Sequence, residues 1–144
     1  MLSEALSPKA VLALLQQLIR IPSVNPTLVP DEAHGEAAIA AFASDWLAQH
    51  GLRSWLEEPK ADRPNAVAEV GDGNGPTLVF CAHLDTVGTS GMTIPPFEPR
   101  LENGKVFGRG SYDMKRQRSG SDVSSSGAGG QRAPGAGAGG SRGR

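Results

Sequence analysis

The sequence predicts an α/β domain built from layers of helix and sheet, followed by a segment that cannot fold. Three observations support this prediction. Apolar residues recur at helical spacing near the N-terminus, an unbroken run of strand-forming residues occupies positions 77–81, and an Asn-Gly pair at 103–104 separates two short strand-like runs. From residue 116 onward the only large aliphatic residue is Val123, so the folded part is expected to end near residue 115.

Two helices are expected before the first strand. Ser7 as a cap and Pro8 at the first position predict a helix over residues 8–20. Gly51 is placed to end a second helix, predicted over residues 31–50. The expected apolar faces consist of Val11, Leu14, Leu15, Leu18 and Ile19 in the first helix and Ile39, Phe42, Ala43, Trp46 and Leu47 in the second.

After Gly51 the apolar residues no longer recur at helical spacing, and short strands are predicted over residues 53–57 and 65–70. Residues 77–81 read Thr-Leu-Val-Phe-Cys without a polar interruption, which is typical of a strand covered on both faces in the middle of an α/β sheet. The pair Asn103-Gly104 predicts a tight hairpin.

The composition averages two unlike parts. The chain as a whole is 38% hydrophobic with a net charge of −1. Residues 116–144 contain nine Gly, six Ser and four Ala, with five Arg against one Asp, and are predicted to be disordered. Residues 1–115 therefore carry a net charge of −5 and no basic surface for nucleic acid or an anionic membrane.

Cysteine usage and hydropathy bear on location. Cys81 is the only cysteine, so no intrachain disulfide can form. Glu4 and Lys9 fall where a signal peptide needs an apolar core, and no apolar run of 18 residues exists. A cytoplasmic protein is expected.

The candidate chemistry lies in two motifs. His83 and Asp85 follow the end of the predicted strand at 77–81, where α/β sheets collect their ligands, and the spacing permits the carboxylate to hold the imidazole. Asp113 follows two glycines, Gly108 and Gly110, which allow a tight turn to direct it inward. The alternatives are a chance His-x-Asp triplet at a strand end and a helix N-cap role for Asp113.

Three stretches, taken in order, resemble the N-terminal signatures of the co-catalytic zinc amidohydrolases. They are Arg-Ile-Pro-Ser-Val-Asn-Pro at 20–26, Ala-His-Leu-Asp-Thr-Val at 82–87 and Gly-Arg-Gly-Ser-Tyr-Asp-Met-Lys at 108–115. That family of metallopeptidases includes acetylornithine deacetylase, succinyl-diaminopimelate desuccinylase, aminoacylase and glutamate carboxypeptidase. The resemblance covers about residues 6–115. It implies that these residues are the N-terminal portion of an α/β/α layered catalytic domain.

The resemblance also implies roles for individual residues. His83 would ligate one zinc ion, Asp85 would orient that histidine as the catalytic carboxylate, and Asp113 would bridge two zinc ions, with cobalt as a substitute metal. Intact relatives would use the pair to activate water for hydrolysis of small N-acyl amino acids or peptides. With only this part of the site present, weak or partial zinc binding is expected.

The chain departs from the family after Lys115. The expected Gly-Gly and apolar helix are replaced by a polar tail, and the later Glu-Glu pair and remaining ligands are absent. A GC-rich message read out of frame would give such a tail, so we interpret residues 1–115 as an incomplete, truncated domain and expect the chain to be inactive alone. The alternative is a metal-binding or interaction module that acts through a partner chain, with self-association through exposed sheet edges. An RNA-binding tail is disfavoured because it lacks aromatic residues.

Four other residues have simpler interpretations. Cys81 is expected to be a buried small hydrophobe, although a thiolate ligand is conceivable. His34 and His50 are expected on the surface at opposite ends of the second helix. Lys115 is expected to be solvated, with a contact to a carboxylate as the alternative.

Overall fold

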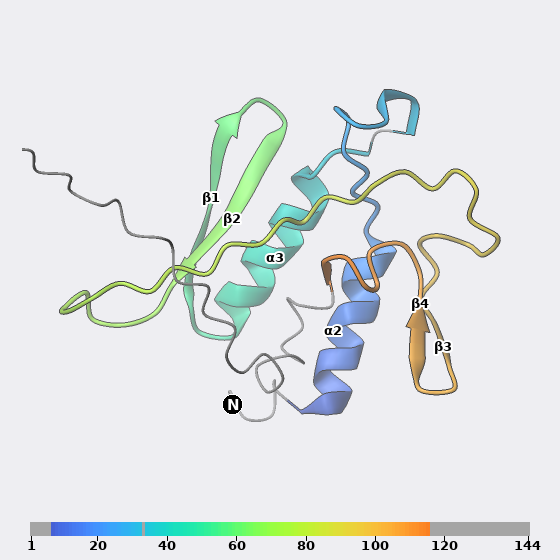
Figure 1. Ribbon diagram of the computed structural model, residues 1–144. Coiled ribbons are helices and arrows are strands. Elements are labelled where there is room, and N and C mark those ends of the chain that lie inside the picture. The colour runs from blue at the N-terminus through green and yellow to red at the C-terminus, as the bar shows by residue number, and fades with distance from the viewer. Residues whose placement is uncertain (1–6, 33, 116–144) are drawn as a thin grey trace, which may run out of the picture.

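The computed structural model describes residues 7–32 and 34–115 (Figure 1). In chain order they form helix α2 (Pro8–Arg20), the short 3-10 helix η1 (Pro30–Glu32), helix α3 (Ala37–Gln49), strands β1 (Arg53–Lys60) and β2 (Arg63–Glu69), and strands β3 (Arg100–Glu102) and β4 (Lys105–Phe107). This mixture of helix and sheet confirms the predicted α/β class. The predicted disordered tail lies outside the described residues.

Helix α2 matches its prediction at both ends. The Ser7 hydroxyl accepts a hydrogen bond from the Ala10 amide at 3.2 Å, and Pro8 occupies the first turn, where its missing amide costs nothing. The helix buries one face, which consists of Val11, Leu15, Leu18 and Ile19. Together with Val24 and three residues of α3, Ile39, Ala40 and Ala43, this face forms the small apolar core.

Helix α3 begins later than predicted, at Ala37 rather than residue 31. Gly35 adopts a left-handed backbone conformation with φ +70°, which separates η1 from the helix. Glu36 follows at the N-cap position, and its buried carboxylate accepts a hydrogen bond from Arg63 Nε at 2.6 Å and pairs with Arg63 Nη2. This double contact ties α3 to the start of β2.

The two hairpins confirm the predicted strands at 53–57 and 65–70 and the predicted turn. β1 and β2 pair antiparallel, with Arg53 opposite Glu69, and α3 packs against both strands (Figure 1). β3 and β4 also pair antiparallel. At their turn Asn103 and Gly104 have φ of +50° and +73°, the conformation for which an Asn-Gly pair is favoured.

The prediction of a central strand at residues 77–81 is wrong. This stretch is extended but belongs to no strand, and the side chains of Leu78, Val79 and Phe80 are 77%, 77% and 88% exposed. A strand of this composition needs neighbours on both edges and cover on both faces. The described residues supply neither the neighbouring strands nor the cover. Residues 77–81 therefore have the composition of a strand but form no inter-strand hydrogen bonds with the described residues.

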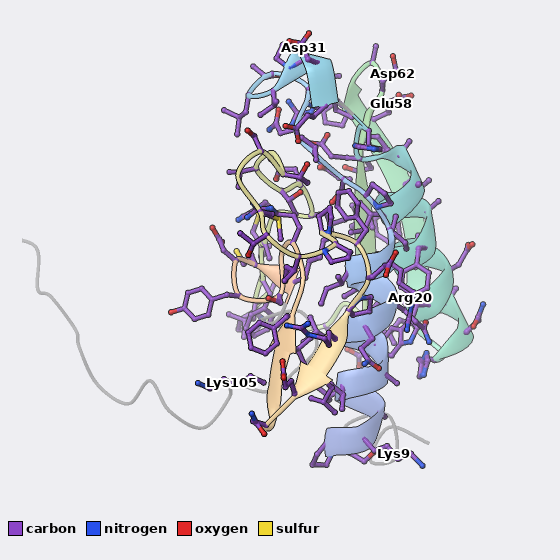
Figure 2. The ribbon with its side chains drawn as sticks, turned by 90° about the vertical axis from the view of Figure 1, so that its right-hand side faces the viewer. Lys9, Arg20, Asp31, Glu58, Asp62 and Lys105 are labelled. Carbon is purple, nitrogen blue, oxygen red and sulfur yellow. The ribbon has the colours of Figure 1, made fainter. Side chains whose placement is uncertain are left out.

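Arg20, at the end of α2, lies near the middle of the molecule in Figure 2. Asp31, Glu58 and Asp62 lie toward one end, whereas Lys9 and Lys105 lie toward the other (Figure 2). Over residues 7–32 and 34–115, none of the helices has the length and apolar character needed to cross a membrane.

Candidate metal centre

The segment that carries the first motif is held to the loop after α2. Val24 and Thr86 form an isolated parallel bridge, in which the Thr86 amide donates to the Ser23 carbonyl at 2.9 Å and the Asn25 amide donates to the Thr86 carbonyl at 2.9 Å. The Ser23 hydroxyl also donates to the Leu84 carbonyl at 2.9 Å. Because most of these residues are buried, the bridge fixes the backbone of the motif.

His83 and Asp85 lie side by side on this fixed backbone. His83 Nδ1 is 3.0 Å from Asp85 Oδ1 and 3.1 Å from the Asp85 carbonyl oxygen. The second carboxylate oxygen of Asp85 accepts a hydrogen bond from Asn25 Nδ2 at 2.6 Å. A proton on Nδ1 that is donated to Asp85 leaves the lone pair of His83 on Nε2, where a metal ion can bind it.

Asp113 approaches the same histidine from a different part of the chain. Its Oδ1 lies 3.4 Å from His83 Nε2, and its side chain is 78% exposed. The free nitrogen of the imidazole and a solvent-accessible carboxylate therefore border one space. All three residues singled out in the sequence, His83, Asp85 and Asp113, meet at this place.

Lys115 anchors the turn that carries Asp113, which contradicts the expectation of a solvated side chain. Lys115 is 1% exposed, and its Nζ donates to the carbonyl oxygens of Leu18 at 2.9 Å and Ile21 at 3.0 Å. These carbonyls lie at the C-terminal end of α2, where a cation is favoured. Burial lowers the pKa of Lys115 to about 8.

The paired glycines make this close packing possible, as predicted. Gly110 has φ +80°, and a Cβ there would lie 2.7 Å from Lys115 Cδ. Gly108 has φ +150°, and a Cβ there would lie 2.7 Å from Ile19 Cγ2. Gly108 therefore lets the backbone of the turn approach α2, and Gly110 leaves room for the side chain of Lys115.

A pocket of about 360 Å³ opens beside the three residues, and Leu28, Tyr112 and Arg109 contribute to its lining. Nε of Arg109 is buried without a hydrogen-bond partner among the described residues. Nearby, Glu32 Oε2 accepts hydrogen bonds from the Thr89 amide at 2.5 Å and the Thr89 hydroxyl at 2.7 Å. These bonds lower the pKa of Glu32, and the charge of Arg109 adds to the effect.

The other candidates stay outside the site. Cys81 is exposed, so its expected burial is wrong. Its neighbours cannot cover it because residues 77–81 have no flanking strands. His34 is exposed with its ring against Phe97, and the half-buried His50 stacks on Trp46.

Sequence reasoning missed two positioning residues. Asn25 lies in the stretch at 20–26, and its bond to Asp85 spans 60 positions in the chain, so spacing alone does not predict it. Lys115 closes the Asp-Met-Lys motif and was given a surface role. The available signal for each was its place inside a recognised motif, which indicates that it is needed but not what it contacts.

The segment that carries His83, Asp85 and Asp113 has known relatives. Residues 79–120 match the sequence pattern of peptidase family M20/M25/M40. A probable succinyl-diaminopimelate desuccinylase of Staphylococcus epidermidis is 33% identical over 113 residues, which cover 76% of this chain and 26% of that protein. Over this region the chain belongs to peptidase family M20/M25/M40. The succinyl-diaminopimelate desuccinylase of Methylobacterium radiotolerans is 39% identical over 115 residues, covering 76% of this chain and 27% of that enzyme.

Coverage of these relatives is limited. The Halorhodospira halophila succinyl-diaminopimelate desuccinylase is 33% identical over 115 residues, or 74% of this chain and 26% of that enzyme. The chain therefore spans about a quarter of the length of the curated relatives that it matches.

The residues present fit a zinc ion in kind but not in number. An imidazole nitrogen and a carboxylate are both common zinc ligands, and zinc sites in proteins are usually four-coordinate. Within residues 7–32 and 34–115, no group of three or more His, Cys, Asp or Glu side chains is arranged to hold a metal ion. His83 and Asp113 amount to half of a tetrahedral set.

Proposed function

We propose that this chain is the metal-holding N-terminal part of a zinc-dependent hydrolase of linear amides, of the deacetylase, desuccinylase or carboxypeptidase type. In this proposal His83 and Asp113 ligate zinc, and Asp85 orients His83. One observation supports it above the others: His83 Nε2 faces Asp113 at 3.4 Å while its Nδ1 is held by Asp85 at 3.0 Å. The substrate class follows from the desuccinylases that the chain resembles.

Each residue of the site then has one task. A zinc pair, when bound, would polarise an amide carbonyl and lower the pKa of a coordinated water. Asp85 accepts a hydrogen bond from Nδ1–H of His83, which fixes the tautomer and raises the basicity of Nε2. Asn25 holds the other oxygen of Asp85, so the carboxylate cannot rotate away. Asp113 supplies the second ligand from a turn anchored by Lys115.

The described residues offer no general base, and we propose that the chain alone has no hydrolytic activity. Glu57 and Glu58 are exposed on β1, and Glu32 is engaged by Thr89 with a lowered pKa, which makes it a poor proton acceptor. Two ligands would bind zinc weakly. If a full structural site contributes ~10–16 kcal/mol, half of it leaves roughly 5–8 kcal/mol, or dissociation constants from about micromolar to sub-millimolar.

Metal binding by the full chain tests the proposal without relying on activity. Zinc affinity would be measured by competition with a chromophoric chelator, and cobalt would report coordination by its visible absorption. We expect binding that His83→Ala abolishes and that the matched surface variant His34→Ala leaves unchanged. Equal binding by the chain and by His83→Ala would refute the assignment of the ligands.

A hydrolysis assay separates this proposal from a second one, a metal-binding or interaction module that acts through a partner chain. Turnover of an N-succinyl or N-acetyl amino acid above the His83→Ala background would refute the claim of inactivity. Stoichiometric zinc binding without turnover agrees with both, and activity gained on mixing with a separately expressed remainder of a relative would favour the hydrolase part. We further propose a cytoplasmic location and no nucleic-acid or membrane partner, in keeping with a lone, exposed cysteine and a net negative charge.

A further inference from the structure

Arg63, the first residue of β2, uses all three nitrogens of its guanidinium group. Its Nε donates to Glu36 Oε2 at 2.6 Å, and its Nη2 pairs with the other oxygen of the same carboxylate. The remaining nitrogen, Nη1, donates to the hydroxyl of Thr27 at 3.3 Å. Because Glu36 is the N-cap of α3, this one side chain joins the starts of α3 and β2 to the loop after α2.

Thr27 is linked to the candidate metal centre through Asn25. The Thr27 amide donates to Asn25 Oδ1 at 2.8 Å, and Asn25 Nδ2 donates to Asp85 Oδ2 at 2.6 Å. A backbone amide only donates and an ionised carboxylate only accepts, so these two partners fix which way the Asn25 amide faces. Asp85 in turn lies 3.0 Å from His83 Nδ1. A continuous series of contacts therefore joins Glu36, Arg63, Thr27, Asn25, Asp85 and His83.

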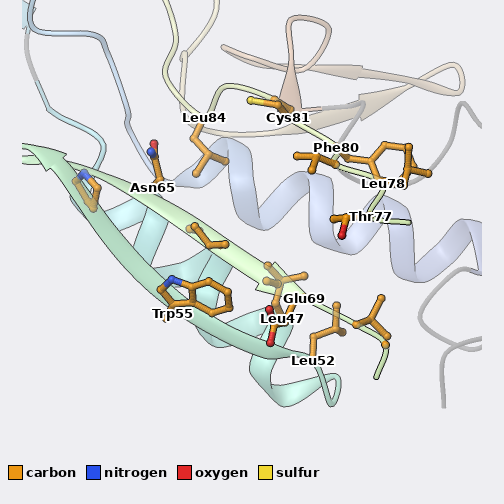
Figure 3. Close-up of a pocket in the computed structure, with 18 of the residues that line it drawn as sticks. Leu47, Leu52, Trp55, Asn65, Glu69, Thr77, Leu78, Phe80, Cys81 and Leu84 are labelled. Atoms are coloured by element: carbon orange, nitrogen blue, oxygen red, sulfur yellow. The ribbon is translucent and has the colours of Figure 1, made fainter. Parts of the chain in front are cut away.

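Arg63 also interacts with Asp85 electrostatically. Both residues line a pocket of about 1260 Å³, in which Figure 3 shows Asn65 of β2 on one side and Leu84 on the other. The hydrogen bond to Glu36 raises the pKa of Arg63, and the negative charges of Glu36 and Asp85 act in the same direction. A positive charge therefore attracts the Asp85 carboxylate in addition to the hydrogen bonds that this carboxylate accepts.

We propose that Arg63 is a positioning residue of the metal centre, which orients Asp85, and through it His83, by way of the loop after α2. This inference rests on the proposed function, in which His83 binds the metal through Nε2. Lysine cannot replace Arg63 in this role, because a single ammonium nitrogen does not bind Glu36 at two points and Thr27 at a third. The junction of α3 and β2 thereby contributes to the geometry of a site that lies elsewhere in the chain.

The test needs variants that separate positioning from stability. Substitution of Arg63 alone leaves the buried Glu36 carboxylate without its counter-ion and destabilises the fold. The double variant Glu36→Gln/Arg63→Gln removes both charges together. Thr27→Val removes only the hydroxyl that Nη1 contacts, at an exposed position, and keeps the test decisive even where the double variant does not fold. Arg53→Gln, which breaks the exposed ion pair with Glu69 on the same hairpin, is the matched control.

The first measurement is made on the metal-free full chain, at a pH above the titration range of histidine. Nitrogen-15 NMR then reports which ring nitrogen of His83 carries the proton. We expect the Nδ1–H form in the parent and in Arg53→Gln, and a larger share of the Nε2–H form in Thr27→Val and in the double variant. A purely structural role of Arg63 would not change the tautomer in folded Thr27→Val. The same tautomer in all of these proteins would overturn the inference.

The second measurement is the zinc affinity of the same full-length proteins, by chelator competition. Because Arg63 acts through further residues, we expect losses below those for a ligand's direct partner, about 3-fold for Thr27→Val and about 5-fold for the double variant. Arg53→Gln should bind zinc as the parent does. Zinc binding that requires His83 but is unchanged in Thr27→Val would overturn this inference and leave the proposed function in place. A parent that binds no zinc, or binds it equally well as His83→Ala, would overturn both.

Discussion

Residues 77–81 and residues 83–87 are near neighbours in the chain, but only the second stretch is integrated into the described fold. In the first, Phe80 is 88% exposed and no described residue pairs with the backbone. In the second, Thr86 is 4% exposed and its amide and carbonyl both bond to the loop after α2. The carboxylate of Asp85 has a partner on each oxygen.

The difference lies in where the partners come from. The site draws on residues 23–25, on the end of α2 and on residues 108–115, all of which the chain contains. Residues 77–81 would need strands on both edges, and the described residues contain no further strand to offer. A site can therefore be shaped locally while the sheet beside it remains incomplete. Single substitutions can test how much the stability and zinc affinity of the site depend on these local contacts.

The largest effect is expected at Lys115. Lys115→Ala removes a buried side chain and both hydrogen bonds to the end of α2, and should lower the free energy of unfolding by about 3–5 kcal/mol. Lys115→Met keeps most of the volume and should cost less, about 1–2 kcal/mol. Urea denaturation followed by circular dichroism measures both. An alanine variant as stable as the parent would show that the turn does not depend on this anchor.

Gly110 tests the close packing of the same turn. Gly110→Ala places a Cβ 2.7 Å from Lys115 Cδ at φ +80°, and Gly91→Ala imposes the same backbone conformation, φ +78°, with nothing within 4 Å. We expect a loss of about 1–2 kcal/mol for Gly91→Ala from backbone strain, and about 2–3 kcal/mol for Gly110→Ala. Equal losses would mean that the clash with Lys115 is relieved without cost.

Asn25 tests the orientation of the histidine rather than the fold. Asn25→Ala frees one oxygen of Asp85 and should weaken zinc binding about 10-fold, the usual size of an effect transmitted through a ligand's partner. Asn65→Ala, at an exposed position on β2, is the matched control and should leave zinc affinity unchanged. Chelator competition gives both affinities. Identical affinities for the two variants would remove Asn25 from the proposed site.

Sequence reasoning succeeded where the governing interactions are local. The Ser7 cap, the apolar face of α2 and the turn at Asn103 each depend on residues within a few positions, and all three were predicted. The contact between His83 and Asp85 is also local, because the two residues are only two positions apart in the chain. The meeting with Asp113 was implied by the family resemblance rather than by spacing.

Sequence reasoning failed where the structure of a segment depends on residues far away in the chain. Residues 77–81 have the composition of a covered strand, but composition does not say whether the neighbouring strands are present. Lys115 was expected in water because most lysines are, and its burial depends on carbonyls 94 and 97 positions away. The start of α3 was missed because Gly35 could be read either as a tolerated helix residue or as a break.

The smallest effect concerns Glu32, which steadies the loop beside the pocket. Hydrogen bonds from Thr89 lower the pKa of this carboxyl below its usual 4.5, so the folded state favours the ionised form. The resulting stabilisation is present above pH 4.5 and is lost as the pH falls through the lowered pKa of the folded state. Glu32→Gln should therefore lose less stability than the parent between neutral and acidic pH, while the exposed control Glu98→Gln should follow the parent. Parallel curves for all three proteins in urea titrations at each pH would show that the contact with Thr89 contributes nothing to the fold.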